Sequence, residues 1–179
     1  MAYQRIKGRV VKLGDYVNTD VISPSRWMRE GLEVLRLHTM EAIRADFYKD
    51  VKPGDILVAG RNFGCGSHRE PATAIIRVLG ISAIVADSVG RLYYRNGIAF
   101  GIPVFGVEGI SRLIEEGEEL EIIMGSDRVT FRNVTRSGQL TAPPIPETMA
   151  KVLEAGGVYP LLKQRLTGGV ETHGGKAAK

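Results

Sequence analysis

The chain has 179 residues, of which 44% are hydrophobic and 25% are charged, with a formal net charge of +4 and a single cysteine. This length fits one domain with its own core, and one cysteine excludes an internal disulfide, a Cys-rich zinc site and an iron–sulfur cluster held by this chain alone. No apolar run approaches the ~18 residues of a membrane span and no apolar signal region opens the chain, so we expect a cytoplasmic protein.

Positive charge is concentrated in the first half of the sequence. Residues 1–100 carry 15 Lys and Arg against 10 Asp and Glu, whereas residues 101–150 carry 4 against 8. This distribution favours an anionic ligand in the first half. Nucleic acid is not expected, because the basic residues are scattered among acids without a ladder of aromatics. The three histidines are widely separated, and the sequence predicts no metal site.

The first elements predicted along the chain are a strand, a loop and a helix. Residues 6–13 alternate in polarity and are rich in β-branched side chains, which predicts a strand. Residues 14–30 are rich in turn formers and predict a long loop, a kind of segment that is usually functional. Residues 31–45 carry apolar side chains at helical spacing, which predicts a helix.

The middle of the chain predicts strands alternating with helices. Short apolar runs predict strands at residues 55–60, 82–87 and 102–105, and helices are expected between them at 69–79 and 91–99. This order with short connections predicts an α/β fold with a mixed, largely parallel sheet flanked by helices.

The last part of the chain predicts an antiparallel pair and two helices. Residues 118–123 and 128–134 alternate around a Gly-Ser-Asp turn and predict the pair. Residues 146–154 and 158–166 predict helices. Two Gly-Gly pairs and few apolar residues follow, so we expect one domain over residues 1–166 and a disordered tail over 167–179.

One segment stands out as a candidate site: Gly60-Arg-Asn-Phe-Gly-Cys-Gly-Ser-His-Arg-Glu70. Glycines 64 and 66 allow a sharp turn, and the helix that follows presents free N–H groups and its positive dipole end. Ser67 and Arg69 add a hydroxyl and a guanidinium, which together predict an anion site suited to a carboxylate. The alternative needs no ligand: Ser67-x-x-Glu70 is also a capping box, although Pro71 would favour Glu70 as the cap.

Two further segments carry candidate residues. Residues 18–30 contain the only tryptophan, Trp27, close to Arg29, and a loop bearing Arg29 could close over an anion. Capping of a turn by Asp20 and simple packing of Trp27 are the alternatives. In residues 91–97, Tyr93 is expected to pack in the core, and Asn-Gly is a natural helix stop.

Taken together, three stretches resemble a known family. Thr19-Asp-Val-Ile-Ser-Pro24, Asn62-Phe-Gly-Cys-Gly-Ser-His-Arg-Glu70 and Tyr93-Tyr-Arg-Asn-Gly97 occur in the order and at the spacing of small subunits of the aconitase superfamily. The resemblance is closest to the 3-isopropylmalate dehydratase (isopropylmalate isomerase) small subunits. It extends from about Ile6 to Leu166.

The resemblance implies a swivelling β/β/α domain, as in the last domain of aconitase, and an active site shared with a large subunit. That partner would carry a [4Fe–4S] cluster whose open iron binds a small hydroxy-dicarboxylate substrate. The family's catalytic base matches Ser67, acting as an alkoxide, and its substrate-carboxylate arginine matches Arg69. The aspartate of its Thr-Asp-x-Ile motif matches Asp20, and its specificity loop matches Trp27, Met28 and Arg29.

The chemistry agrees with those roles. A helix N-terminus, backbone N–H groups and Arg69 would each stabilise a serine alkoxide, and the elimination needs a Lewis acid that this chain cannot supply. Two residues depart from the family pattern: His68 replaces a serine and Pro71 a histidine. We expect His68 to alter the hydrogen bonds at the oxyanion or at the substrate carboxylate. Cys65 is expected to be a small buried residue of the turn.

The resulting hypothesis is a hydro-lyase subunit that isomerises 2-isopropylmalate to 3-isopropylmalate in leucine biosynthesis. Trp27 and Met28 suit an alkyl group, but Arg29 also suits the third carboxylate of a homoaconitase substrate. A homoaconitase small subunit and a non-catalytic anion-binding module are therefore the alternatives. Whether the isolated chain forms a homo-oligomer is open.

Overall fold

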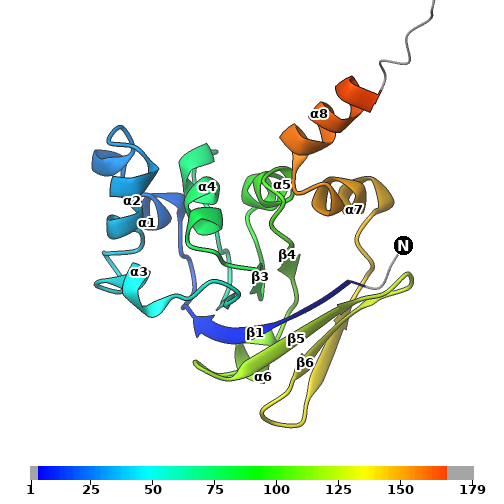
Figure 1. Cartoon of the computed structure of the whole chain (residues 1–179). Helices are drawn as coiled ribbons and strands as arrows, with labels where there is room; N and C mark the ends of the chain where they lie inside the picture. The colour runs from blue at the N-terminus through cyan, green and yellow to red at the C-terminus, as the bar shows by residue number, and fades with distance from the viewer. Residues whose placement is uncertain (1–3, 169–179) are drawn as a thin grey trace, which may run out of the picture.

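The computed structural model describes residues 4–168, and they form one mixed sheet of seven strands in the order β4-β3-β2-β1-β5-β6-β7 (Figure 1). The pairs β1–β2, β2–β3 and β3–β4 are parallel, and β1–β5, β5–β6 and β6–β7 are antiparallel. The strands are β1 (Gln4–Lys12), β2 (Ile56–Ala59), β3 (Ala83–Ala86), β4 (Val104–Gly106), β5 (Glu119–Met124), β6 (Val129–Asn133) and β7 (Gln139–Ala142).

Strand β1 joins the two halves of the sheet. Its first residues, Gln4–Arg9, pair with β5, and its last residues, Val10–Lys12, pair with β2. Val10 and Val11 are both fully buried but belong to different cores, because successive side chains of a strand point to opposite faces. Every residue of β2 and β3 is also buried, with side chains alternating between these two cores on opposite faces of the sheet. Burial on both faces explains the continuous apolar runs of these strands.

Helices cover both faces of the parallel half. In Figure 1, α1, α2, α4, α5 and α7 lie in a row on one side of the sheet, and α8 projects away from them. On the other face, α6 and the antiparallel strands enclose the second core. The helices are α1 (Thr19–Ile22), the 3-10 turn η1 (Ser25–Trp27), α2 (Leu32–His38), α3 (Phe47–Asp50), α4 (Glu70–Val78), α5 (Arg91–Ala99), α6 (Ile110–Leu113), α7 (Glu147–Glu154) and α8 (Val158–Gly168). Within residues 4–168, no helix is long and apolar enough to cross a bilayer.

The expected α/β class and flanking helices are confirmed, but the sheet is parallel in only half of its pairings. The sequence missed β7 because Gln139–Ala142 is short and has no buried residue. It also missed α3 and α6, which have four residues each and are too short to show helical periodicity.

Three boundaries differ from the expectations. The predicted helix over 31–45 ends at His38, because Thr39 leaves the helical region and Met40 adopts a left-handed φ of 58°. The predicted loop over 14–30 contains α1 and η1. The last helix continues through Gly168, so the expected tail does not begin at 167, and residues 169–179 lie outside the described part.

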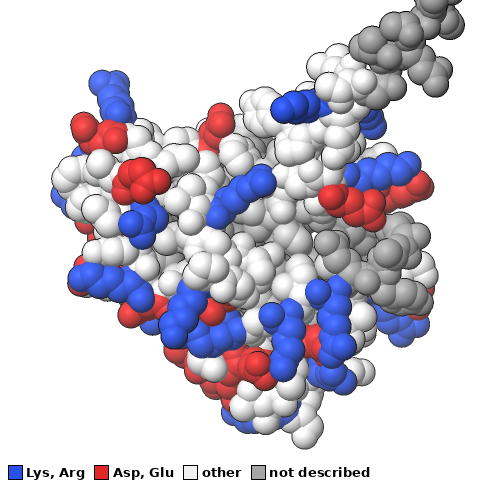
Figure 2. All heavy atoms as spheres, viewed as in Figure 1, with Lys and Arg blue, Asp and Glu red and all other residues white. Residues whose placement is uncertain are grey.

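Opposite charges are mixed over the surface. Figure 2 shows Lys and Arg side chains beside Asp and Glu over most of one face. The excess of positive charge in the first half of the sequence is therefore not gathered into one basic patch on that face.

Candidate functional site

The loop of residues 60–69 leaves the carboxyl end of β2 and leads into α4, and its glycines are required by the structure. Gly64 and Gly66 have φ angles of +69° and +104°. A Cβ atom on Gly64 would lie 2.2 Å from Cγ of Tyr93, far closer than two carbon atoms can approach. The prediction that these glycines shape the turn is confirmed.

Backbone hydrogen bonds fasten this loop to the segment that follows β1. The N–H of Gly64 donates to the carbonyl of Val17 at 2.8 Å, and the N–H of Thr19 donates to the carbonyl of Cys65 at 2.9 Å. Cys65 is half-buried, less covered than expected. These bonds bring α1 next to the start of α4, although the two are far apart in sequence.

Ser67, Arg69 and Asp20 form one polar cluster, as the resemblance implies. Nε of Arg69 donates to Oγ of Ser67 at 2.7 Å, and its Nη1 pairs with Asp20. Nη1 also donates to Oγ of Ser25 at 3.1 Å, and that hydroxyl lies 3.3 Å from Oδ1 of Asp20. The Arg69 side chain is 25% exposed, whereas Ser67 is exposed. Sequence reasoning missed Ser25, whose only signal was its place in the turn-rich segment.

The capping-box alternative is wrong, because α4 begins later than it requires. Arg69 is the N-cap residue, no side chain caps the helix, and Glu70 and Pro71 occupy its first two positions. The Ser67 hydroxyl therefore accepts a hydrogen bond from a guanidinium instead of satisfying a helix N–H. A cation at this distance stabilises negative charge on the serine oxygen.

His68 contacts α5 through Asn96. Its Nε2 lies 2.5 Å from Oδ1 of Asn96. A direct role for His68 at a bound carboxylate requires the imidazole to turn away from Asn96. Nearby Tyr93 is a packing residue, as expected: it is buried edge-on against Phe63, its hydroxyl donates to the carbonyl of Ala72 at 3.1 Å, and burial raises its pKa.

The expected specificity loop is anchored through its tryptophan. Trp27 stacks on His38 with ring centroids 3.9 Å apart, and its Nε1 donates to Oε1 of Glu41 at 3.1 Å. Met28 is half-buried and Arg29 is exposed. Within residues 4–168, the Arg29 side chain makes no hydrogen bond or ion pair, so it is not joined to Ser67 or Arg69 in this way.

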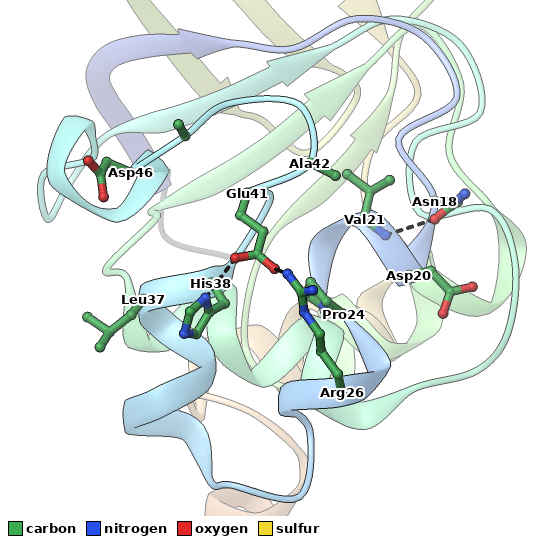
Figure 3. Close-up of a pocket in the computed structure, with 11 residues that line it drawn as sticks. Asn18, Asp20, Val21, Pro24, Arg26, Leu37, His38, Glu41, Ala42 and Asp46 are labelled. Atoms are coloured by element: carbon green, nitrogen blue, oxygen red, sulfur yellow. Dashed lines mark hydrogen bonds and ion pairs between the residues drawn. The ribbon is translucent and has the colours of Figure 1, made fainter.

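A groove of about 800 Å³ lies beside this loop, between α1, η1 and the segment after α2 (Figure 3). Glu41 lies inside it, facing His38 and Arg26, and Asp20 is on its wall. The lining residues are Asn18, Asp20, Val21, Pro24, Arg26, Leu37, His38, Glu41, Ala42, Ala45 and Asp46.

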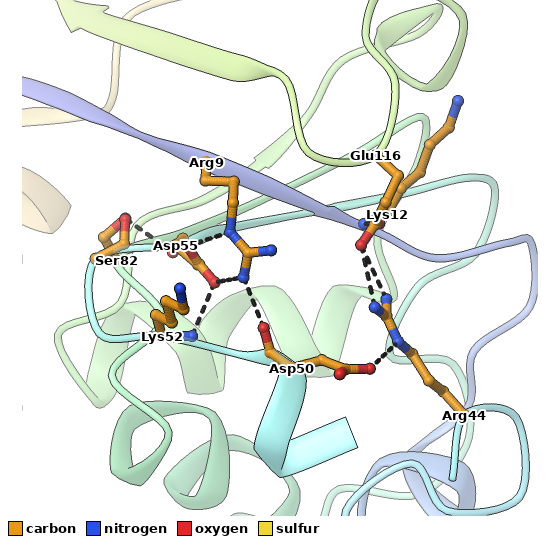
Figure 4. A network of polar contacts seen from close by, with 9 residues as sticks. Arg9, Lys12, Arg44, Asp50, Lys52, Asp55, Ser82 and Glu116 are labelled. Carbon is orange, nitrogen blue, oxygen red and sulfur yellow. Dashed lines mark hydrogen bonds and ion pairs between the residues drawn. The ribbon is translucent and has the colours of Figure 1, made fainter. Parts of the chain in front are cut away.

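Two other arginines of the first half, Arg9 and Arg61, are engaged in structural pairs. Arg9 holds the buried carboxylate of Asp55 with its Nε at 3.2 Å and a terminal nitrogen at 2.5 Å (Figure 4). Asp55 also accepts the N–H of Lys52 at 2.8 Å, and the hydrogen bonds between Asp55 and Arg9 raise the pKa of the guanidinium. Arg61 pairs with Asp15 at 2.8 Å, and its hydrogen bonds lower the pKa of that carboxyl.

The described residues offer no metal centre. No group of three His, Cys, Asp or Glu side chains in residues 4–168 is placed to hold a metal ion. An iron–sulfur cluster does not fit the residues present in this part of the chain.

Comparisons with known proteins agree with the architecture. The family model of the aconitase C-terminal domain matches residues 26–104. The isopropylmalate/citramalate isomerase small subunit of Methanocaldococcus jannaschii is 43% identical over 90% of this chain and 95% of its own length. The 3-isopropylmalate dehydratase small subunit of Thermodesulfovibrio yellowstonii is 41% identical over 91% and 96%. The crystal structure of a 3-isopropylmalate dehydratase from M. jannaschii superposes with a TM-score of 0.81 at 36% identity, covering 92% of this chain and 96% of that one.

Proposed function

Because this chain belongs to the family of 3-isopropylmalate dehydratase small subunits, we propose that it forms a hydro-lyase with a large subunit. The enzyme isomerises 2-isopropylmalate to 3-isopropylmalate by removing and re-adding water, a step of leucine biosynthesis in the cytoplasm. The observation that carries the proposed site is the hydrogen bond from Nε of Arg69 to Oγ of Ser67.

In this proposal Ser67 is the base. As an alkoxide, its oxygen takes a proton from the carbon next to a substrate carboxylate. Arg69 stabilises the negative charge of this oxygen before the proton is transferred. Arg69 has Nε on Ser67 and Nη1 on Ser25 and Asp20, which leaves Nη2 to bind the carboxylate. Asp20 orients the guanidinium.

The exposure of Ser67 supports a shared active site. A serine alkoxide is strongly disfavoured in water, and Ser67 is exposed in this chain. A large subunit that covers it would exclude water and strengthen its interaction with Arg69. In this proposal the Lewis acid is a [4Fe–4S] cluster on that partner, which would polarise the bond to the leaving hydroxyl; the family resemblance supports this assignment.

The substrate side chain is assigned to the segment of Trp27, Met28 and Arg29. A homoaconitase is the second candidate function, because the exposed Arg29 guanidinium could bind a third carboxylate. In either enzyme His68 is proposed to contact the substrate after releasing Asn96.

The test is assembly and turnover. We would co-express the chain with its large subunit and assay 2-isopropylmalate, citramalate and homocitrate. Ser67→Ala should lower kcat by at least about 1000-fold while the complex still assembles. Ser126→Ala, at an exposed turn between β5 and β6, is the matched control and should keep full activity.

Two results would oppose the proposal. Full turnover by the assembled Ser67→Ala enzyme would remove Ser67 as the base. A stable homo-oligomer that never binds a large subunit would instead favour the anion-binding module.

A further inference from the structure

Glu41 is half-buried in the groove beside the candidate site, and its carboxylate contacts three side chains (Figure 3). Its carboxylate pairs with Arg26, accepts Nε1–H of Trp27 at 3.1 Å and lies 2.7 Å from Nδ1 of His38. The side chain is only 24% exposed. Neither the family resemblance nor the proposed reaction assigns it a role.

These contacts join η1 to the end of α2. Arg26 and Trp27 belong to η1, whereas His38 is the last residue of α2 and Glu41 follows it. The Trp27 ring stacks on His38 with an interplanar angle of 12°, and Cζ of Arg26 lies 5.3 Å from the Trp27 ring centroid. A carboxylate that faces a guanidinium and an indole N–H makes strong, directional hydrogen bonds, and the stacked rings add to them.

Besides the Glu41 contacts, η1 is held by partial packing of Trp27 against the core and by the hydrogen bonds of Ser25. No residue of η1 is buried, and no side chain caps it. One end of the segment presents Ser25, which accepts a hydrogen bond from Arg69. The other end presents the exposed Arg29. The positions of Ser25 and Arg29 therefore depend on how η1 is fixed. The Glu41 carboxylate contacts two of the three η1 residues, Arg26 and Trp27.

We propose that Glu41 is a positioning residue that clamps η1 through Arg26 and Trp27 and so sets the place of Ser25 and Arg29 at the substrate site. The inference rests on the proposed function for its effect on substrate, but the clamp itself can be tested without turnover. Hydrogen bonds from His38 and Arg26 lower the pKa of Glu41 to about 2, so the carboxylate stays ionised at any working pH.

The first test uses Trp27 emission, because it is the only tryptophan of the chain. In Glu41→Gln the isolated subunit should show red-shifted emission and at least about twofold stronger acrylamide quenching than the wild type, because the indole becomes more exposed. Arg26→Gln should shift emission in the same direction. Glu33→Gln removes an 87% exposed carboxylate from α2 and should leave emission unchanged.

The second test uses the assembled enzyme and 2-isopropylmalate. Glu41→Gln should raise KM about tenfold with kcat changed less than about threefold, and Glu41→Asp should recover part of the loss. Unchanged emission in Glu41→Gln and Arg26→Gln would overturn the clamp. Changed emission with an unchanged KM would overturn the positioning role. If the wild-type complex fails to turn over any substrate, the proposed function fails, while the emission result still decides the clamp.

Discussion

Replacement of Gly64 by Ala tests how rigidly the site loop is held. Gly64 has a φ of +69°, and its place for a Cβ atom is filled by Tyr93, with Cγ at 2.2 Å, Cβ at 2.5 Å and Cδ2 at 2.7 Å. The near part of a buried ring cannot move aside as the end of a flexible side chain could. Either the loop or α5 must shift.

The size of the effect follows from these contacts. A left-handed φ disfavours alanine by roughly 1–2 kcal/mol, and forced overpacking of a core adds about 1–3 kcal/mol. Displacement of Tyr93 also weakens its edge-on contact with Phe63, worth about 1 kcal/mol. We therefore predict that Gly64→Ala lowers the free energy of unfolding by about 4 kcal/mol.

Urea unfolding of the isolated subunit, followed by circular dichroism, measures this change. Gly14→Ala is the control, because Gly14 is exposed and no atom lies within 4 Å of the place that its Cβ would occupy. A loss below about 0.5 kcal/mol is expected for this control. A loss below about 1 kcal/mol in Gly64→Ala would show that Tyr93 does not fix the loop.

Three further predictions concern stability. Tyr93→Phe leaves the Ala72 carbonyl without its hydroxyl donor and should lower the free energy of unfolding by about 1–2 kcal/mol in thermal melts. Asp55→Ala removes the buried carboxylate that holds Arg9 and should lower it by about 3 kcal/mol in urea. The pKa of Glu41 is about 2 in the folded chain and ordinarily 4.5, so its stabilisation is complete above pH 4.5 and is lost as the pH falls toward 2. Acid titration should therefore cost the wild type about 1 kcal/mol more than Glu41→Gln over that window, after allowance for solvent screening, and equal losses would contradict this.

The sequence predicted the parallel half of the fold well, because its signals are local. Strands β2 and β3 are apolar throughout, and the apolar residues of α4 and α5, which follow them, recur at helical spacing. Both patterns match the structure. The aconitase-type fold that the resemblance implied is confirmed by the comparisons. The elements that the sequence did not predict have only three or four residues each: α1, η1, α3, α6 and β7.

Part of the candidate site could also be predicted from the sequence, and part of it could not. The glycine turn was visible in the sequence, because only glycine accepts the φ angles of positions 64 and 66 without strain. The meeting of Asp20 with Arg69 was not, since it depends on backbone bonds between distant loops and was expected only from the family resemblance. Glu41 was not singled out in the sequence, because its contacts with Trp27 and Arg26 arise only in the folded chain.

The structure shows that part of the positive charge in the first half of the sequence is already paired within the fold. Arg9 and Arg61 neutralise Asp55 and Asp15, so their positive charges serve the fold and are not available to a ligand. Arg69 is partly neutralised by Asp20 but keeps one terminal nitrogen for a carboxylate. Arg29 alone in this group has no partner among residues 4–168. In the proposed function, an anionic substrate would meet the oriented guanidinium of Arg69 and the unpaired one of Arg29, and the proposed clamp at Glu41 would set the distance between them.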